Sequence, residues 1–264
     1  MTTLSLTSFF VLSLTLLRSV TAYAEQAPQT IKLGYAEACP HMCPYNEDKG
    51  FTADIATAVY AQYGYQVELV ALPWARVAAD TLNGDLHGAL SAGKEETPDL
   101  LFPDTEIALQ SDCFYGSSTD KWVAGNADSF LNRKTIIFKG WGFDEKFKRQ
   151  LGVENYNASF HEFSIDEFYT KRVASMINLK RADAFWMDVN VFAYSKRNNP
   201  SLIGDNIRNL GCINHQKLYL ALSPKNPFLS AKLSKEFDQG MSTLRKSGEL
   251  AEILKKYGLT DWAQ

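Results

Sequence analysis

The chain has 264 residues, 45% of them hydrophobic, and its 27 Lys and Arg against 30 Asp and Glu give a formal net charge of -3. This length can bury the core of two lobes, and the hydrophobic fraction excludes an intrinsically disordered chain. The near-neutral charge, without a long basic run, excludes a general binder of nucleic acid or anionic membrane, so we expect no nucleic-acid partner.

An apolar segment near the N-terminus is typical of a secretory signal peptide. Residues 4–17 are mainly apolar over the length of a signal h-region, and they are too short for a membrane span, which needs about 20 residues. Residues 22–24 (Ala-Tyr-Ala) then form an A-x-A cleavage pattern. The only nearby basic residue, Arg18, follows the apolar run, which leaves a buried N-terminal helix as the alternative. We expect a signal peptide over 1–24 and a periplasmic mature protein.

The first part of the mature chain alternates between strand and helix patterns. Strands are expected at 30–36, 66–71 and 86–92, and helices at 52–63 and 73–83. Thr52 is the expected N-cap of the first helix, with Asp54 in its first turn, where a carboxylate suits the helix dipole. An irregular loop over 37–49 holds two prolines and two cysteines. The alternation favours a parallel α/β sheet.

The second part of the chain repeats this alternation. Extended segments are expected at 112–115, 122–123, 134–138, 182–187 and 217–222. Helices are expected up to 151 after the Gly-rich segment at 140–143, and at 165–179, 189–196, 229–247 and 250–257. There is no repeat, low-complexity tract or flexible linker, so short ordered crossings are expected to join the two lobes.

All four cysteines lie in the expected mature chain, where an oxidising compartment favours disulfides. Three connectivities are possible, and we favour the local pair Cys39–Cys43 with the long-range pair Cys113–Cys212. The alternative for 39–43 is a soft-metal site, because its thiolate, imidazole and thioether groups suit copper. No second ligand cluster lies nearby in the sequence, so we expect no metal.

Polar, charged and aromatic residues follow the predicted strands, and ligands of open parallel sheets bind beyond the carboxyl ends of the strands. The candidate ligand-binding residues are Glu37, Tyr45, Trp74, Arg76, Ser91, Gly93, Lys94, Trp141, Gly142, Phe143 and Asp188. An arginine can hold a carboxylate through two hydrogen bonds, and a desolvated aspartate can hold an ammonium group. The set therefore suits a small zwitterion or anion with an apolar part. Alternatively, the two tryptophans belong to the core, and Arg76 and Lys94 are solvated surface charges.

Motifs of catalysis are absent from the sequence. There is no G-x-S-x-G, G-x-x-x-x-G-K-[ST], G-x-G-x-x-G or H-E-x-x-H pattern, and the four histidines show no metal-binding spacing. We therefore expect neither a cofactor nor an enzyme.

Four groups of short motifs occur in a characteristic order. They are GFTADI at 50–55, PWARV at 73–77 with LNGDLHG at 82–88, RADA at 181–184 followed by Asp188, and SGEL at 247–250 with KYGL at 256–259. In this order the chain resembles the periplasmic solute-binding proteins of family 3, the polar amino-acid binders. The resemblance covers nearly all of the mature chain.

The resemblance implies a periplasmic binding-protein type II fold, with two Rossmann-like α/β lobes whose mixed, mainly parallel sheets are joined by a two-strand hinge. Lobe 1 is expected to comprise 25–111 and 226–264, and lobe 2 to comprise 112–225. A monomer is expected to close around a small polar or zwitterionic ligand and to serve an ABC transporter or sensor in the inner membrane. In the family, the residue that matches Asp188 holds the amino group of the ligand.

One departure from the family concerns the ligand carboxylate. Residues 93–99 lack the arginine of the family's T-x-x-R motif, so that clamp is missing or replaced by Arg76 or Lys94, and an α-amino acid ligand is not implied. We expect Arg76 and Asp188 to hold opposite ends of the ligand. The alternatives are a dehydratase-like enzyme on the same scaffold, with Glu37 as acid or base, and a copper-handling protein using Cys39–Cys43.

Overall fold

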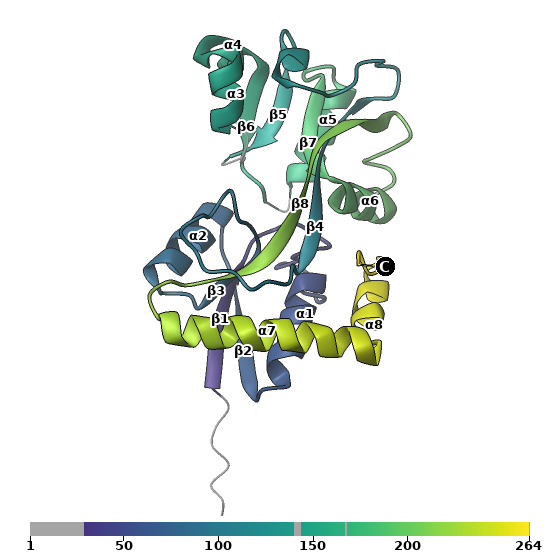
Figure 1. Cartoon of the computed structure of the whole chain (residues 1–264). Coiled ribbons are helices and arrows are strands. Elements are labelled where there is room, and N and C mark those ends of the chain that lie inside the picture. The colour runs from purple at the N-terminus through teal and green to yellow at the C-terminus, as the bar shows by residue number, and fades with distance from the viewer. Residues whose placement is uncertain (1–28, 140–143, 167, 264) are drawn as a thin grey trace, which may run out of the picture.

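A computed structural model describes residues 29–139, 144–166 and 168–263 (Figure 1). The expected signal peptide and its cleavage site lie outside these ranges. None of the helices in the described ranges is both long enough and apolar enough to cross a membrane.

Eight strands form one curled sheet in the order β2-β1-β3-β8-β4-β7-β5-β6. The strands are β1 (Gln29–Tyr35), β2 (Tyr65–Ala71), β3 (Gly88–Gly93), β4 (Ala108–Ser117), β5 (Thr135–Phe138), β6 (Phe160–Phe163), β7 (Ala184–Asp188) and β8 (Ile207–Leu222). The helices are α1 (Phe51–Ala61), α2 (Trp74–Asn83), α3 (Asp144–Leu151), α4 (Val153–Ser159), α5 (Tyr169–Asn178), α6 (Val189–Asn198), α7 (Pro227–Ser247) and α8 (Glu249–Lys256), with a 3-10 turn, η1, at Ala127–Phe130.

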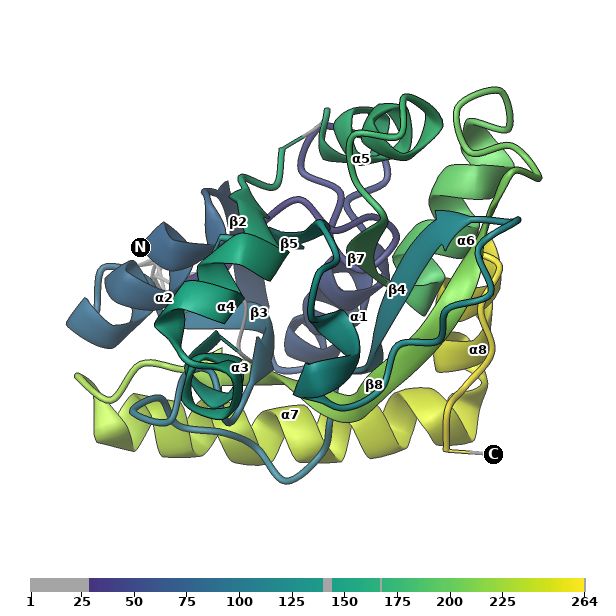
Figure 2. The same ribbon diagram turned by 90° about the horizontal axis from the view of Figure 1, so that it is seen from above.

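The elements gather into two halves that β4 and β8 connect (Figure 1). The lower half contains β1–β3, α1, α2, α7 and α8, and α7 runs across its full width (Figures 1 and 2). The upper half contains β5–β7 and α3–α6. Strand pairs are parallel within each half, β1 with β2 and β3 and β5 with β6 and β7, as the sequence pattern predicted. They are antiparallel wherever β4 or β8 takes part.

Each half has its own buried clusters. In the lower half, α1 and α7 pack on the sheet around Leu33, Tyr60 and Phe237, all fully buried. The two helices approach closely at Gly240, where an added Cβ would lie 2.6 Å from a methyl carbon of Val59. The upper half buries separate clusters on the two faces of its strands. Two cores joined by a pair of strands leave room for a cleft between the halves.

The structure corrects several expected elements. The segments at 112–115 and 217–222 are parts of the longer strands β4 and β8; polar residues in the half-exposed first part of β8 interrupted its apolar pattern. Residues 122–123 are not a strand. The helix expected from 165 begins at Tyr169, because the Asp166 carboxylate accepts a hydrogen bond from the Phe168 amide at 2.8 Å and forms the turn before it. The short elements α4 and β6 were not predicted.

The expected N-cap at Thr52 is also wrong. Helix α1 begins at Phe51 with Gly50 as its N-cap. The Thr52 hydroxyl donates instead to the His41 carbonyl at 2.8 Å and accepts from the Ser91 hydroxyl at 3.2 Å. Thr52 thus fixes the loop that follows β1 against the end of β3.

Both expected disulfides are present. Cys39 and Cys43 close a turn within the loop after β1, with Cα atoms 4.8 Å apart. Cys113 and Cys212 are partners in the pairing of β4 with β8, with Cα atoms 3.9 Å apart, and they are separated by 99 positions in the sequence. The second disulfide closes a loop that contains the elements of the upper half.

The two disulfides are expected to differ in their effect on stability. In the chain-entropy model a loop of about 100 residues contributes about 4.7 kcal/mol and a loop of about five residues contributes about 2 kcal/mol. Replacing Cys113 and Cys212 together by Ser should therefore lower the free energy of unfolding by more than replacing Cys39 and Cys43 together. Urea unfolding of the two double variants measures this difference, and the opposite ranking would contradict it.

Candidate functional site

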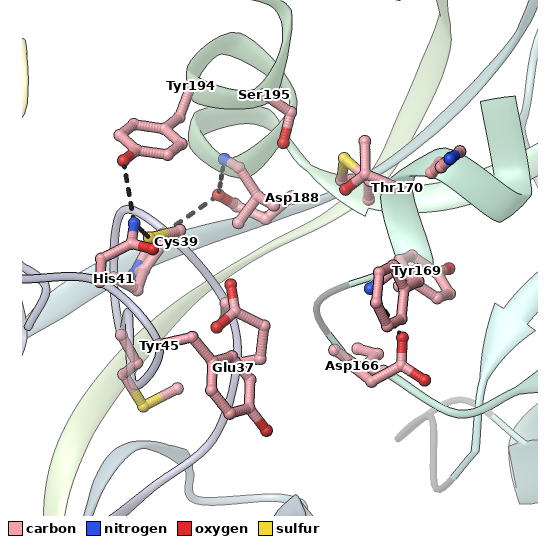
Figure 3. A pocket seen from close by; sticks show the side chains of 18 of the residues that line it. Glu37, Cys39, His41, Tyr45, Asp166, Tyr169, Thr170, Asp188, Tyr194 and Ser195 are labelled. Atoms are coloured by element: carbon pink, nitrogen blue, oxygen red, sulfur yellow. Dashed lines mark hydrogen bonds and ion pairs between the residues drawn. The ribbon is translucent and has the colours of Figure 1, made fainter. Parts of the chain in front are cut away.

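A cleft between the two halves holds two overlapping chambers. Chamber 1 has a volume of about 450 Å³ and extends toward α5 and α6, whereas chamber 2 has a volume of about 390 Å³ and extends toward α2 and β5. The residues that line both chambers are Glu37, Ala38, Met42, Tyr45, Ser91, Gln110, Ile165, Asp166 and Trp186. Since these come from both halves, a ligand in the cleft would contact both (Figure 3).

Five of the predicted site residues meet at this cleft. Glu37, Tyr45 and Ser91 line both chambers, Trp74 lines chamber 2 and Asp188 lines chamber 1. Glu37 follows the end of β1, and Asp188 ends β7. These positions agree with the expectation that ligands bind beyond the carboxyl ends of parallel strands.

Arg76, by contrast, does not line either chamber. Its side chain is 67% exposed, and its Nε atom donates to Asp80 Oδ1 at 2.6 Å, one turn further along α2. The cause is helical phase: two positions along an α-helix rotate a side chain by about 200°, so Trp74 and Arg76 leave α2 on different sides. The structure therefore does not bring Arg76 opposite Asp188.

Lys94 and Gly93 do not line the chambers either. The Lys94 ammonium lies 4.1 Å from the ring centre of Tyr219, which binds it as a cation–π contact away from the cleft. Gly93 is buried beside Glu96 and Gln216. The remaining candidates, Trp141, Gly142 and Phe143, lie outside the described residues.

Asp188 is buried, and hydrogen bonds from the protein occupy its carboxylate. Oδ1 accepts from His41 Nε2 at 3.1 Å and from the backbone amides of Asn190 and Val191 at 2.9 and 3.2 Å, so Asp188 is the N-cap of α6. Oδ2 accepts from the Ser111 amide at 2.8 Å. Burial raises the pKa of Asp188, but these hydrogen bonds and the charge of His41 outweigh it and hold the pKa below its usual value. In this arrangement Asp188 joins the halves.

The contact of Asp188 with His41 belongs to a set that closes one side of the cleft. His41 lies in the loop after β1, and 3% of its side chain is exposed. Nearby, Asn46 Nδ2 donates to the Tyr194 hydroxyl at 3.4 Å, and Arg197 Nη2 donates to the Tyr257 carbonyl at 3.0 Å. Figure 3 shows His41, Asp188 and Tyr194 together at this edge, with Asp166 and Tyr169 across the chamber.

A buried carboxylate also supports the wall that the chambers share. Asp112 on β4 accepts from the indole nitrogen of Trp186 at 2.7 Å and from the amides of Gln110 and Asn214 at 3.1 Å each. Burial raises the pKa of Asp112, and the three hydrogen bonds oppose that rise. Trp186, which packs on Phe138 at a ring-centre distance of 4.6 Å, is thereby fixed in orientation.

Glu96 lines chamber 2 and was not predicted as a site residue. Burial, together with the negative charge of Asp112, raises its pKa to about 7, and the Gln216 side chain opposes the rise by hydrogen bonding. In the sequence Glu96 follows Lys94 and Glu95 in a polar loop, a pattern typical of a solvated surface. Its burial results from packing against β8, which local sequence does not indicate.

The loop at 39–43 shows no arrangement for copper. Its two cysteines form a disulfide, so neither sulfur is a thiolate, and His41 Nε2 is bound to Asp188. Within the described ranges, no group of three or more His, Cys, Asp or Glu side chains is placed to hold a metal ion. The copper-handling alternative is therefore not supported by the geometry of this loop.

Comparisons with known proteins agree with this architecture. The sequence model of the bacterial extracellular solute-binding proteins, family 3, matches residues 31–260, and no curated protein matches the chain. A solved histidine kinase sensor domain with similarity to periplasmic binding proteins has a TM-score of 0.71 and 16% identity, with 89% of this chain and 99% of that chain covered.

Two further solved structures are similar over most of their lengths. An ancestral arginine-binding protein bound to arginine has a TM-score of 0.68 and 17% identity, with coverage of 88% of this chain and 100% of that chain. A putative L-cystine ABC transporter protein from Listeria monocytogenes has a TM-score of 0.67 and 16% identity, with coverage of 87% and 95%. The expected type II periplasmic binding-protein fold is thereby confirmed.

The role of Asp188 in joining the halves predicts a large loss of stability for Asp188→Ala. The variant removes a helix cap and leaves buried His41 without its partner, so the free energy of unfolding should fall by about 2–4 kcal/mol. Asp205→Ala is the control, because Asp205 is fully exposed in its ion pair with Lys196 and should change stability by at most about 0.5 kcal/mol. Equal effects in urea unfolding at pH 7 would contradict the assignment.

The raised pKa of Glu96 predicts a pH-dependent effect of Glu96→Gln. A raised folded-state pKa gives stability that is fully present below the unfolded value of 4.5 and is lost as pH rises through about 7. The variant should therefore match the parent near pH 4.5 and exceed it at pH 8 by about 1–2 kcal/mol. Asp99→Asn, an exposed change in the same loop, should show no such trend. Thermal unfolding of the parent and both variants at pH 4.5 and pH 8 measures these differences. A Glu96→Gln variant that is no more stable than the parent at pH 8 would contradict the prediction.

Proposed function

The chain belongs to the bacterial extracellular solute-binding proteins of family 3, and we propose that it captures a small polar or zwitterionic ligand, an amino acid or a related carboxylate or amine, in the cleft between its halves. The observation that carries this proposal is the pair of chambers lined jointly by both halves at the ends of β1, β3 and β7. A concave site with aromatic walls and a few polar groups is the usual form of a small-molecule site.

Capture is proposed to occur by hinge closure. β4 and β8 are the strands that pass from one half to the other, so bending them would open or close the cleft. The proposed lobes are 25–111 with 226–264, and 112–225. A ligand that contacts both lobes binds the closed form better than the open form and shifts the population toward it.

The closed form is proposed to be recognised in the periplasm by an inner-membrane transporter or sensor. The protein is proposed to reach that compartment through cleavage of residues 1–24, and its two disulfides suit an oxidising environment. Solved structures of similar fold include both a kinase sensor domain and a transporter protein, so both kinds of partner are compatible with this architecture. We propose that the protein binds its ligand without transforming it, because its family consists of binding proteins.

Helix α2 offers a matched pair of variants to test the location of the site. A ligand is first identified by thermal-shift screening of amino acids, amines and small carboxylates, since binding raises the melting temperature. Trp74→Ala should then weaken its binding about tenfold or more, because Trp74 lines chamber 2. Arg76→Ala should leave the affinity within about twofold, because Arg76 is exposed and paired with Asp80.

Isothermal titration calorimetry measures both affinities. If Arg76→Ala abolished binding and Trp74→Ala left it unchanged, the ligand would not lie in chamber 2, and the earlier expectation for Arg76 would be restored.

A further inference from the structure

The wall that the two chambers share has a fixed hydrogen-bond polarity. Ser91, Gln110 and Trp186 line both chambers, so a ligand in either chamber can contact them. Each of these side chains also makes a hydrogen bond within the protein. These bonds determine whether the side chain can donate to a ligand or only accept from it.

Asp112 fixes the orientation of the Gln110 carboxamide. Gln110 Nε2 donates to Asp112 Oδ1 at 3.1 Å, and the same oxygen accepts from the indole nitrogen of Trp186 at 2.7 Å. Because an indole N–H can only donate, Asp112 Oδ1 is an acceptor, and the group of Gln110 that faces it is the NH2 group. The carbonyl oxygen Oε1 of Gln110 is thereby turned away from Asp112. Within the described ranges no residue donates a hydrogen bond to this oxygen, so it can accept one from a ligand.

A chain of hydroxyl groups fixes Ser91 in the same sense. The Thr52 hydroxyl donates its one proton to the His41 carbonyl at 2.8 Å, since a carbonyl can only accept. The Ser91 hydroxyl therefore donates to the Thr52 hydroxyl, at 3.2 Å, and has no second proton for a ligand. What Ser91 Oγ offers to the cleft is a lone pair.

The backbone at Ser91 indicates that this position is specialised. Its φ of 57° lies in the left-handed region, which is uncommon for residues other than glycine. The pairing of β3 with β8 also shifts register between Ala89 and Ala92, so Ser91 lies in an irregular part of the sheet. Bulges and strained backbone are frequent beside binding and active sites, where they re-aim a side chain.

The remaining polar side chains of the shared wall do not change this polarity. Trp186 donates its only N–H group within the protein. The carboxylates of Glu37 and Asp166 can only accept in their ionised form. Tyr45 is 64% exposed and is therefore the solvent-facing member of the wall. Within the described ranges, the buried part of this wall thus offers acceptors to a ligand.

A ligand group that lies against this wall must therefore supply the hydrogen-bond donors. An ammonium, amidinium or carboxamide group carries N–H bonds and can donate to Gln110 Oε1 and to Ser91 Oγ. A carboxylate carries no such bond, so it would leave both oxygens unpaired and bring its own lone pairs against theirs. Polar groups left unpaired in a desolvated site are a strong source of discrimination between ligands.

We propose that Gln110 and Ser91 select the ligand by accepting hydrogen bonds from an N–H-bearing group of it. Their own hydrogen bonds to Asp112 and Thr52 hold the two accepting oxygens in place. The inference rests on the proposed capture of a ligand in this cleft and adds which chemical group the shared wall recognises. Asp188 takes no part in this recognition, because four hydrogen bonds from the protein occupy its carboxylate.

Compounds with and without N–H groups test the recognised group. Calorimetry on the full mature protein compares the common amino acids, ethanolamine, putrescine and agmatine with glycine betaine, choline, succinate and lactate, which have no N–H group. Glycine betaine and choline are the N-methylated forms of glycine and ethanolamine, so they keep the positive charge and lose the donors. At least one compound of the first group should bind at least tenfold more tightly than any of the second. A compound of the second group that binds as tightly, or the failure of the whole first group to bind, would overturn the inference.

Variants on two different strands locate the interaction. Gln110→Met on β4 keeps the length of the side chain and removes the acceptor, and Ser91→Ala on β3 removes the second acceptor. Each should weaken binding of the preferred compound about tenfold. Asn214→Leu is the matched control, because Asn214 also donates to Asp112 at 3.1 Å but lines neither chamber. Its affinity should stay within about twofold of the parent.

The outcomes separate a direct contact with the ligand from an effect through Asp112. Equal losses of affinity in Gln110→Met and Asn214→Leu, or no loss in either Gln110→Met or Ser91→Ala, would overturn the inference. If succinate binds and Trp74→Ala weakens it, capture in the cleft stands and the recognition of an N–H group fails. If an N–H compound binds and none of the cleft variants affects it, the proposed site itself fails.

Discussion

The pairing of β4 with β8 is the constraint on which the arrangement of the two halves depends. These strands pair from Ala108 with Leu218 to Ser117 with Ile207, while β3 extends the sheet from β8 on one side and β7 extends it from β4 on the other. Without this two-stranded ribbon, formed by β4 and β8, the parallel strands of each half would belong to separate sheets. The cleft exists because the ribbon holds two independent cores side by side without merging them.

Two buried carboxylates near the ribbon stabilise the structure around the cleft. Asp188 caps α6 and pairs with His41 across the cleft, and Asp112 orients Trp186 through a hydrogen bond. A polar residue at the carboxyl end of a strand, just before a helix, is placed where it could either bind a ligand or cap the helix. Its position alone does not distinguish the two roles. Here the hydrogen-bond distances show that Asp188 supports the frame of the protein.

The sequence predicted the alternation of strands and helices, the two disulfide pairings and the fold, because these follow from local apolar patterns, cysteine chemistry and motif order. It also identified Glu37, Tyr45, Ser91, Trp74 and Asp188, which follow or end strands or begin a helix or lie in the loop after β1, and all five line the cleft. The prediction of Arg76 as a lining residue was wrong, because Arg76 leaves helix α2 on a different side from Trp74 and is exposed. Glu96 was missed because its burial depends on packing against β8, and the length of β8 was missed because its half-exposed part is polar.

The disulfide between Cys113 and Cys212 has a consequence for how the protein withstands proteolysis. Its two sulfurs join neighbouring strands of the ribbon, and 99 sequence positions separate them. A protease that cuts a surface loop anywhere within that interval would leave both fragments covalently attached at the base of the upper half. A nicked molecule would thus keep its mass without reductant, and both strands of the ribbon would stay in register.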